Sequence, residues 1–215
     1  MAAISKAGCN LGTCHGNATG KGGFKLSLRG QDADFDFKAL ARDASGRRVN
    51  SFAAEKSLLL VKGTNQIAHE GGKRIDPKGW EYAVLCDWIA TGMPRDDSTA
   101  PKVTKLAVTP TEAVLDEPAS TLQIQVQATF ADGTQRDVTE RAIYEPLQNG
   151  LVEVSKSGLV KRLQFGEPSL LVRFLNQSVP VRLTFVKANP AFAWSQPRRN
   201  SKIDAHVFNK LKTLR

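Results

Sequence analysis

The sequence predicts a multidomain α plus β protein, in which a small all-α domain is followed by an all-β sandwich. Two observations lead to this prediction. Apolar residues recur at helical spacing before residue 95, whereas apolar and polar residues alternate after residue 102. The chain has 215 residues and is 41% hydrophobic, which is enough for two cores. We therefore expect domains at residues 1–95 and 102–187, with a tail at 188–215.

Three segments of the first region carry helix signals. The expected helices cover residues 34–46, 54–62 and 76–92. Asp34 or Asp36 can cap the first of them, and a glycine closes each. Asp76 followed by proline gives the third an unusually clear start.

The most informative stretch is Cys9-Asn-Leu-Gly-Thr-Cys14-His15, which puts two thiols and an imidazole close together. In a c-type haem site, two cysteines form thioethers at the porphyrin edge, and the histidine after the second cysteine binds the iron. Adjacent side chains point in different directions, which suits one porphyrin better than one tetrahedral zinc ion. The spacing here is C-x4-C-H, wider than the usual C-x2-C-H. A disulfide between Cys9 and Cys14 is the structural alternative.

A second axial ligand is expected in the irregular stretch between the second and third predicted helices. His69 lies there beside Ala68, Gly71 and Gly72, and such small residues let a flat cofactor come close. We predict His69 as that ligand, with a solvated histidine as the alternative. Met93 is the less favoured candidate, because it follows a helix next to a proline, where a surface position is expected.

Basic residues flank the predicted ligand loop. Guanidinium and ammonium groups pair well with carboxylates, so these residues are candidate contacts of the haem propionates, with a solvated basic face as the alternative. The four candidates are Arg47, Arg48, Lys73 and Arg74.

Composition argues against several other function classes. The net charge of +9 is divided between residues 1–95 and 188–215, and no basic stripe with interleaved aromatics suggests a nucleic-acid partner. No apolar run reaches membrane-spanning length. The glycine-rich segment 16–24 lacks the spacing of a phosphate loop, and no acid–base or nucleophile constellation appears. We therefore expect an electron-transfer haem protein and not an enzyme.

The second region shows short strands bounded by turns. Residues 122–130 alternate apolar and polar side chains, after a polar linker at 95–101. Further strands are expected at residues 151–154, 169–175 and 179–186. Short strands with regular turns are typical of a β-sandwich.

Several blocks of the first region resemble the planctomycete cytochrome c-like domain, almost continuously over residues 4–94. The blocks are Ser5–Gly16, Gly20–Gly30, Gly46–Arg48, Ser57–Lys62, His69–Arg74 and Trp80–Gly92. The resemblance implies a c-type haem on Cys9 and Cys14, with His15 as proximal ligand, and it supports His69 within a His-x-Gly-Gly block.

The second region resembles the bacterial Ig-like group 2 domain, which implies a spacer or adhesion module. The blocks that carry this likeness are Val108–Pro110, Ala128–Gly133, Asp137–Thr139 and Val154–Gly158. The basic tail resembles the opening of a domain that follows such modules in planctomycete multidomain proteins. We therefore expect the sequence to be an N-terminal fragment of a larger protein.

Together these observations predict a cytochrome module with one haem c, which passes single electrons to or from a partner domain or protein. The first alternative is a haem-based sensor or enzyme that binds a gas or peroxide. The second alternative is a zinc-binding structural or adhesion module. Met1-Ala2-Ala3 is not a signal peptide, so we expect an export signal upstream and a periplasmic or cell-surface location.

Overall fold

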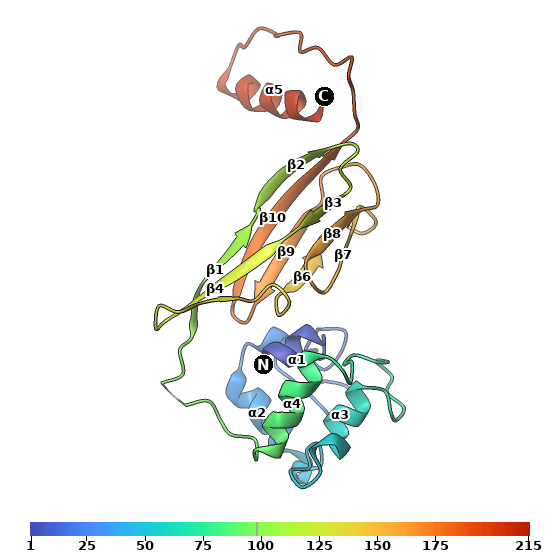
Figure 1. Cartoon of the computed structure of the whole chain (residues 1–215), viewed down its shortest axis with the longest axis vertical. Coiled ribbons are helices and arrows are strands. Elements are labelled where there is room, and N and C mark those ends of the chain that lie inside the picture. Colours follow the sequence, from blue (N-terminus) through green and yellow to red (C-terminus); the bar gives the residue numbers. More distant parts are fainter. Residues whose placement is uncertain (98) are drawn as a thin grey trace.

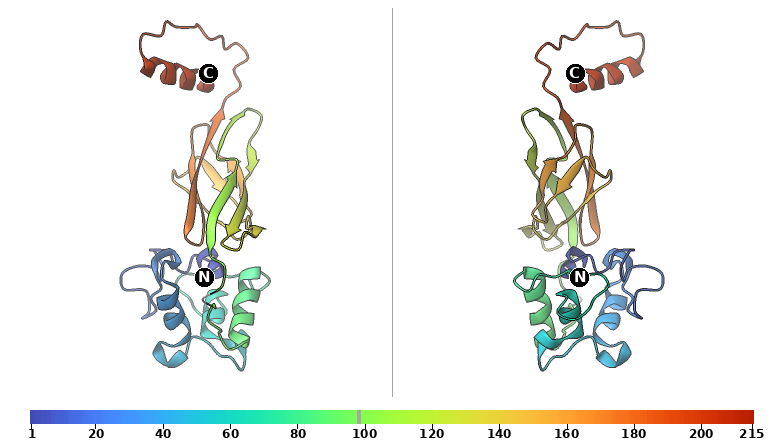
Figure 2. Two further views of the ribbon diagram at one scale, coloured as in Figure 1. Left: turned by 90° about the vertical axis from the view of Figure 1, so that its left-hand side faces the viewer. Right: turned by 90° about the vertical axis from the view of Figure 1, so that its right-hand side faces the viewer.

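A computed structural model describes residues 1–97 and 99–215 of the chain (Figure 1). The predicted linker at 95–101 contains Ser98, which lies outside the described residues. Helices α1 to α4 lie at one end of the molecule, the strands in the middle and helix α5 at the other end (Figures 1 and 2).

The N-terminal region, residues 1–94, is built from short helices joined by turns. Its α-helices are α1 (Ala2–Lys6), α2 (Ala33–Ala41), α3 (Leu58–Gly63) and α4 (Trp80–Ala90). Three 3-10 turns separate them: η1 (Leu28–Gly30), η2 (Ala44–Gly46) and η3 (Ala54–Lys56). Leu26, Leu60, Ile75 and Ile89 are fully buried at the centre of its hydrophobic cluster.

Two helix starts differ from the sequence prediction. The N-cap of α2 is Asp32, whose carboxylate accepts a bond from the amide of Phe35 at 2.9 Å. Asp36, a predicted cap, is instead buried and accepts bonds from the amide and the hydroxyl of Ser27, each at 2.6 Å. Helix α4 begins after Gly79 and not at residue 76, because Asp76 forms a separate turn before the helix.

The β region, residues 102–187, contains ten strands within the described part of the chain. They are β1 (Val103–Thr109), β2 (Glu112–Asp116), β3 (Thr121–Gln123), β4 (Gln125–Phe130), β5 (Gln135–Asp137), β6 (Ile143–Pro146), β7 (Val152–Val154), β8 (Leu159–Arg162), β9 (Ser169–Phe174) and β10 (Gln177–Val186). They form three sheets, with strand orders β1-β4-β5, β2-β10-β9-β6 and β3-β8-β7. The pairing of β2 with β10 is parallel and the other strand pairs are antiparallel. Ile124, Leu170 and Val181 are fully buried in its core.

The predicted fold class is wrong. We expected a small all-α cytochrome c-like domain followed by an all-β Ig-like sandwich, but strands in three sheets dominate the structure and its helices are few and short. Glycines in left-handed conformations, such as Gly8, Gly20 and Gly30, keep the N-terminal backbone in turns. In the β region, the predicted strand 122–130 divides at Ile124 into β3 and β4, which belong to different sheets.

The N-terminal and β regions contact each other through Lys6, the last residue of α1. Its ammonium group donates to the carbonyl oxygens of Ala142 and Lys156 and lies 5.3 Å from the centre of the Tyr144 ring. Burial lowers the pKa of Lys6 to about 8, although the carboxylate of Glu81 acts in the opposite direction. The side chain therefore joins the two regions while partly withdrawn from water.

We expect Lys6 to make stability depend on pH in the alkaline range. An unfolded lysine keeps its proton up to about pH 10.4, so between pH 8 and that value the unfolded state binds more protons and the free energy of unfolding rises with pH. The Lys6→Met variant lacks this contribution. Denaturant titrations at several pH values should show the gap between wild type and variant changing over this window. The exposed Lys38→Met variant should follow the wild type, and a gap that stays constant would contradict the assignment.

The tail carries helix α5 (Lys202–Leu214), which begins at a capping box formed by Ser201 and Asp204. Ion pairs join it to the β region, from Lys210 to Glu167 and from Arg215 to Asp116. Within the residues that the structure describes, no helix has the length and apolar character needed to cross a membrane.

Candidate functional site: a cavity lined by two histidines and two thiols

The Cys9–His15 segment forms a closed turn. The amide of His15 donates to the carbonyl of Cys9 at 3.0 Å, and the amides of Cys14 and Gly16 both donate to the carbonyl of Leu11, at 2.9 and 3.0 Å. The residues between the two cysteines are therefore taken up by the turn. As a result, the wide spacing of the motif still brings His15 back beside Cys9.

His15 is held by the segment that follows the turn. Its Nδ1 bonds to the carbonyl of Phe24 at 2.9 Å, and the two rings lie 4.5 Å apart. A carbonyl oxygen can only accept, so Nδ1 donates and Nε2 of the neutral ring keeps its lone pair. Burial lowers the pKa of His15, and the neighbouring His69 lowers it further, which favours this neutral, metal-binding form.

His69, in a later loop of the chain, is held by the same kind of hydrogen bond. Its Nδ1 donates to the carbonyl of Gly72 at 2.8 Å, which again leaves Nε2 available. A Cβ on Gly71 would lie 2.9 Å from the His69 ring, so this loop conformation needs glycine there. Lys62, at the end of α3, donates to the carbonyl of Ala68 and ties the loop to the helix.

Both histidines line one cavity of about 500 Å3, which is within the usual size for a cofactor pocket of about 300–1,000 Å3. Their ring planes are within 10° of parallel, and the ring centroids are 6.3 Å apart. The cavity is lined by Cys9, Thr13, Cys14, His15, Lys21, Gly22, Phe24, Arg47, Arg48, Leu58, Leu59, Lys62, Gly63, His69, Glu70, Gly71 and Arg74. The structure thus brings together the four predicted cofactor ligands.

The two cysteines of the motif are free thiols and face the cavity from different depths. Cys9 is 8% exposed, and burial, followed by the nearby Cys14, raises its pKa to about 11. Cys14 is partly exposed. The disulfide considered from the sequence is not formed, since all three cysteines of the chain are free.

Arg48 has a structural role that the sequence did not indicate. Its guanidinium group donates to the carbonyls of Ala39 and Gly23, at 2.9 and 3.1 Å, and lies 4.6 Å from the centre of the Phe24 ring. It therefore supports the segment whose carbonyl holds His15. Most of its donors are used by the backbone, which makes it a positioning residue more than a free cation.

Of the other three predicted propionate contacts, two line the cavity and one does not. Arg47 and Arg74 line the cavity, and the Nε of Arg74 is buried without a hydrogen-bond partner among the described residues. Lys73 is absent from the cavity lining and lies 3.6 Å from the carboxylate of Asp76. Cations that the sequence reasoning missed are Lys21 and Lys62. With Glu70 as the one acidic lining residue among those described, the cavity is strongly positive.

The structure also adds apolar walls and places Met93 elsewhere. Phe24, Leu58 and Leu59 line the cavity, whereas Met93 packs against the hydrophobic cluster of the N-terminal region. The run Leu58-Leu-Leu60 was the available signal for these walls. Three successive leucines in a helix cannot all face one core, so one of them must face another surface.

A compact metal site is not formed by the part of the chain that the structure describes. No three histidine, cysteine, aspartate or glutamate side chains among residues 1–97 and 99–215 are grouped so that they could hold one metal ion.

Comparisons with known proteins give distant similarities to solved structures. No protein-family model and no curated protein matches the chain. The S-layer protein SbsC domains 4 and 5 are similar at 16% identity and TM-score 0.33, over 40% of this chain and 53% of that one. Domains 5–6 of the same protein give 18% identity and TM-score 0.35, over 42% and 47%. The chain thus spans about half the length of these structures, and similarity this weak carries no argument about function.

Proposed function

We propose that the N-terminal region binds one haem c covalently through Cys9 and Cys14, with His15 and His69 as axial ligands, and that it passes single electrons to or from a partner. The observation that carries the proposal is the geometry of the two histidines in one cavity with both thiols. Haem supplies an iron that changes oxidation state by one electron without needing a proton-transfer residue.

The distance between the imidazole rings fits two ligands of one iron. A metal–imidazole bond is about 2.0 Å, and a ring atom lies roughly 1.1 Å from the ring centre, so two imidazoles bound through Nε2 on opposite sides of one ion have centroids about 6 Å apart. The observed separation of 6.3 Å agrees with this value. Both Nδ1 atoms are already bonded to carbonyl groups, an arrangement common in metal-binding histidines.

The cysteines and the cations fit the rest of the ligand. Each free thiol can add across a vinyl group, so that a C–S bond forms and the thiol hydrogen moves to the other vinyl carbon. The apolar side chains of Phe24, Leu58 and Leu59 suit a porphyrin ring, and Arg47 and Arg74 suit its carboxylates. Two histidines on one iron leave no open coordination position, which favours electron transfer over the gas- or peroxide-binding alternative.

Mass spectrometry of the protein matured with haem-attachment machinery tests the proposal. The intact chain should gain the mass of one haem and keep it through acid–organic extraction. Cys9→Ala and Cys14→Ala should each remove one thioether, whereas Cys86→Ala, the third cysteine, should leave attachment unchanged. An unmodified mass would refute covalent attachment, and zinc found by elemental analysis would then favour the zinc-binding alternative. The proposal includes export to the periplasm or cell surface, which cell fractionation can test.

Replacement of Arg74 by glutamine should lower the midpoint potential. The ferric state carries one more positive charge than the ferrous state, so removing a nearby cation stabilises the ferric state, by an amount on the order of tens of millivolts. The matched variant Lys73→Gln changes a neighbouring cation outside the cavity lining, and its potential should stay near that of the wild type. Equal shifts in both variants on redox titration would argue against a propionate contact at Arg74.

A further inference from the structure

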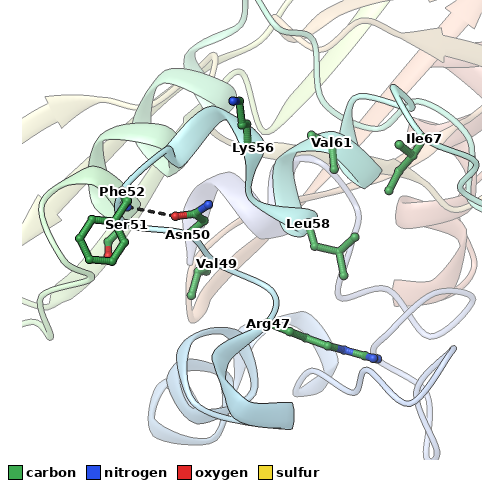
Figure 3. Close-up of a pocket in the computed structure, with 9 residues that line it drawn as sticks. All are labelled: Arg47, Val49, Asn50, Ser51, Phe52, Lys56, Leu58, Val61 and Ile67. Carbon is green, nitrogen blue, oxygen red and sulfur yellow. Dashed lines mark hydrogen bonds between the residues drawn. The ribbon is translucent and has the colours of Figure 1, made fainter.

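A second hollow lies directly beside the two-histidine cavity. This groove, of about 630 Å3, is lined by Arg47, Val49, Asn50, Ser51, Phe52, Lys56, Leu58, Val61 and Ile67 (Figure 3). Arg47 and Leu58 line both hollows, so the groove and the cavity share a wall. A molecule bound against this wall would therefore be separated from the cavity by the side chains of Arg47 and Leu58.

The groove exposes apolar side chains that the fold does not cover. Phe52 is fully exposed and Ile67 is 43% exposed. Exposed apolar groups that gather beside polar ones are typical of interaction sites. The backbone at Phe52 is held in a turn, since its amide and that of Ala53 donate to Asn50 Oδ1, at 3.1 and 3.2 Å. The aromatic ring is thus presented on an ordered turn, which lowers the entropic cost of docking.

The charge of the groove indicates what kind of partner it suits. Its charged lining residues among those described are Arg47 and Lys56, with no carboxylate in the lining. Neither side chain forms an ion pair with a described residue. A partner with carboxylates around an apolar patch would complement both features of this surface.

We propose that this groove is the docking surface for an acidic electron-transfer protein, an inference that rests on the proposed function of the neighbouring cavity. The partner's apolar patch packs on Phe52 and Ile67, and its carboxylates face Lys56, while Arg47 in the shared wall stays with the cavity. Arg47 and Leu58, which line both hollows, would separate the partner from a haem in the cavity, and the haem would supply one electron to the partner's oxidised centre with no proton transferred.

Plastocyanin, an acidic blue-copper protein with an apolar patch, is a suitable probe. Both proteins are kept reduced, Fe(II) and Cu(I), so that no electron flows and binding alone is measured. In 15N NMR titrations of the haem-loaded chain, amides of residues 51–56 and 61–67 should shift, and the dissociation constant should rise with salt. Phe52→Ser and Lys56→Glu should each weaken binding about tenfold. Lys38→Glu makes the same charge change on the exposed face of α2 and should weaken binding much less.

Three results would overturn the proposal. These are shifts confined to other surfaces, equal effects of Lys56→Glu and Lys38→Glu, and sedimentation of a dimer that Phe52→Ser dissociates. The optical spectrum of the same samples separates this test from that of the proposed function. If the matured chain carries no haem and still binds plastocyanin at the groove, the haem assignment is refuted and the docking surface stands. If the chain carries haem but does not bind at the groove, the docking surface alone is refuted.

Discussion

Replacement of His69 by alanine is expected to convert a low-spin, six-coordinate iron into a high-spin iron that readily takes up carbon monoxide or cyanide. The reason is the position of the His69 ring, which lies nearly parallel to the His15 ring with centroids 6.3 Å apart in the same cavity. Among the described residues that line the cavity, His15 and His69 are the ones with an imidazole, and none has the thioether of methionine. Absorption spectra with and without added carbon monoxide measure the change.

Met93→Leu is the control for this experiment. Met93 packs in the hydrophobic cluster of the N-terminal region and is absent from the cavity lining, so a substitution that conserves its volume should leave the spectrum as it is. If Met93→Leu becomes high-spin while His69→Ala stays low-spin, the axial ligand has been misassigned. If the unmodified protein is already high-spin, the gas- or peroxide-binding alternative gains over electron transfer.

Gly16→Ala is expected to lower the free energy of unfolding by roughly 3 kcal/mol or more and to impair haem attachment. An ideal Cβ at Gly16 would overlap the carbonyl oxygen of Asn10 and lie 2.7 Å from its carbonyl carbon. Both atoms belong to the backbone, and Asn10 is itself buried with its side chain bonded to Ser5, so the loop cannot easily move away. Relief of the overlap would open the turn that brings Cys9 and His15 together.

Gly12→Ala is the matched substitution in the same turn. A Cβ at Gly12 would meet only the side chain of Leu28, at 3.8 Å, which is ordinary contact. We expect this variant to stay within about 0.5 kcal/mol of the wild type and to attach haem normally. Chemical denaturation and intact mass, measured on both variants, test the argument. If both variants lose the same stability and haem attachment, the overlap with the Asn10 carbonyl is not the cause of the loss.

Local patterns in the sequence predicted elements better than they predicted architecture. Strands β7, β9 and β10 lie close to their expected ranges, because alternation reports on which side chains face a core. The break at Ile124 was not predictable in this way. There the amide bonds to the carbonyl of Gly158, and a Cβ on Gly158 would lie 2.9 Å from the Ile124 carbonyl oxygen. Such a contact between distant residues leaves no trace in local periodicity.

The helix errors have a similar cause. Asp34, Asp36 and Asp76 all resemble N-caps, but Asp36 is drawn into the interior by Ser27, and Asp76 is used in a turn of its own. Competition among several carboxylates for one helix start is decided by tertiary contacts, which the sequence does not display.

The sequence predicted the residues that would bind the cofactor but not the residues that hold them in position. Cys9, Cys14, His15 and His69 were all selected from the sequence, and the structure brings them to one cavity. The role of Arg48, which braces the Phe24 segment, depends on contacts across 25 residues of chain and could not be read from spacing. For a basic residue near a predicted cofactor, charge alone does not separate a ligand contact from a structural one.

Electron paramagnetic resonance of the ferric, haem-loaded protein reports directly on coordination of the iron by His15 and His69. Two imidazoles whose planes lie within 10° of parallel act together on the same iron d orbitals and remove their degeneracy. We therefore expect a rhombic low-spin spectrum, which is retained in Met93→Leu and lost in His69→Ala. A high-spin axial spectrum in the unmodified protein, or the absence of any haem iron signal, would contradict it.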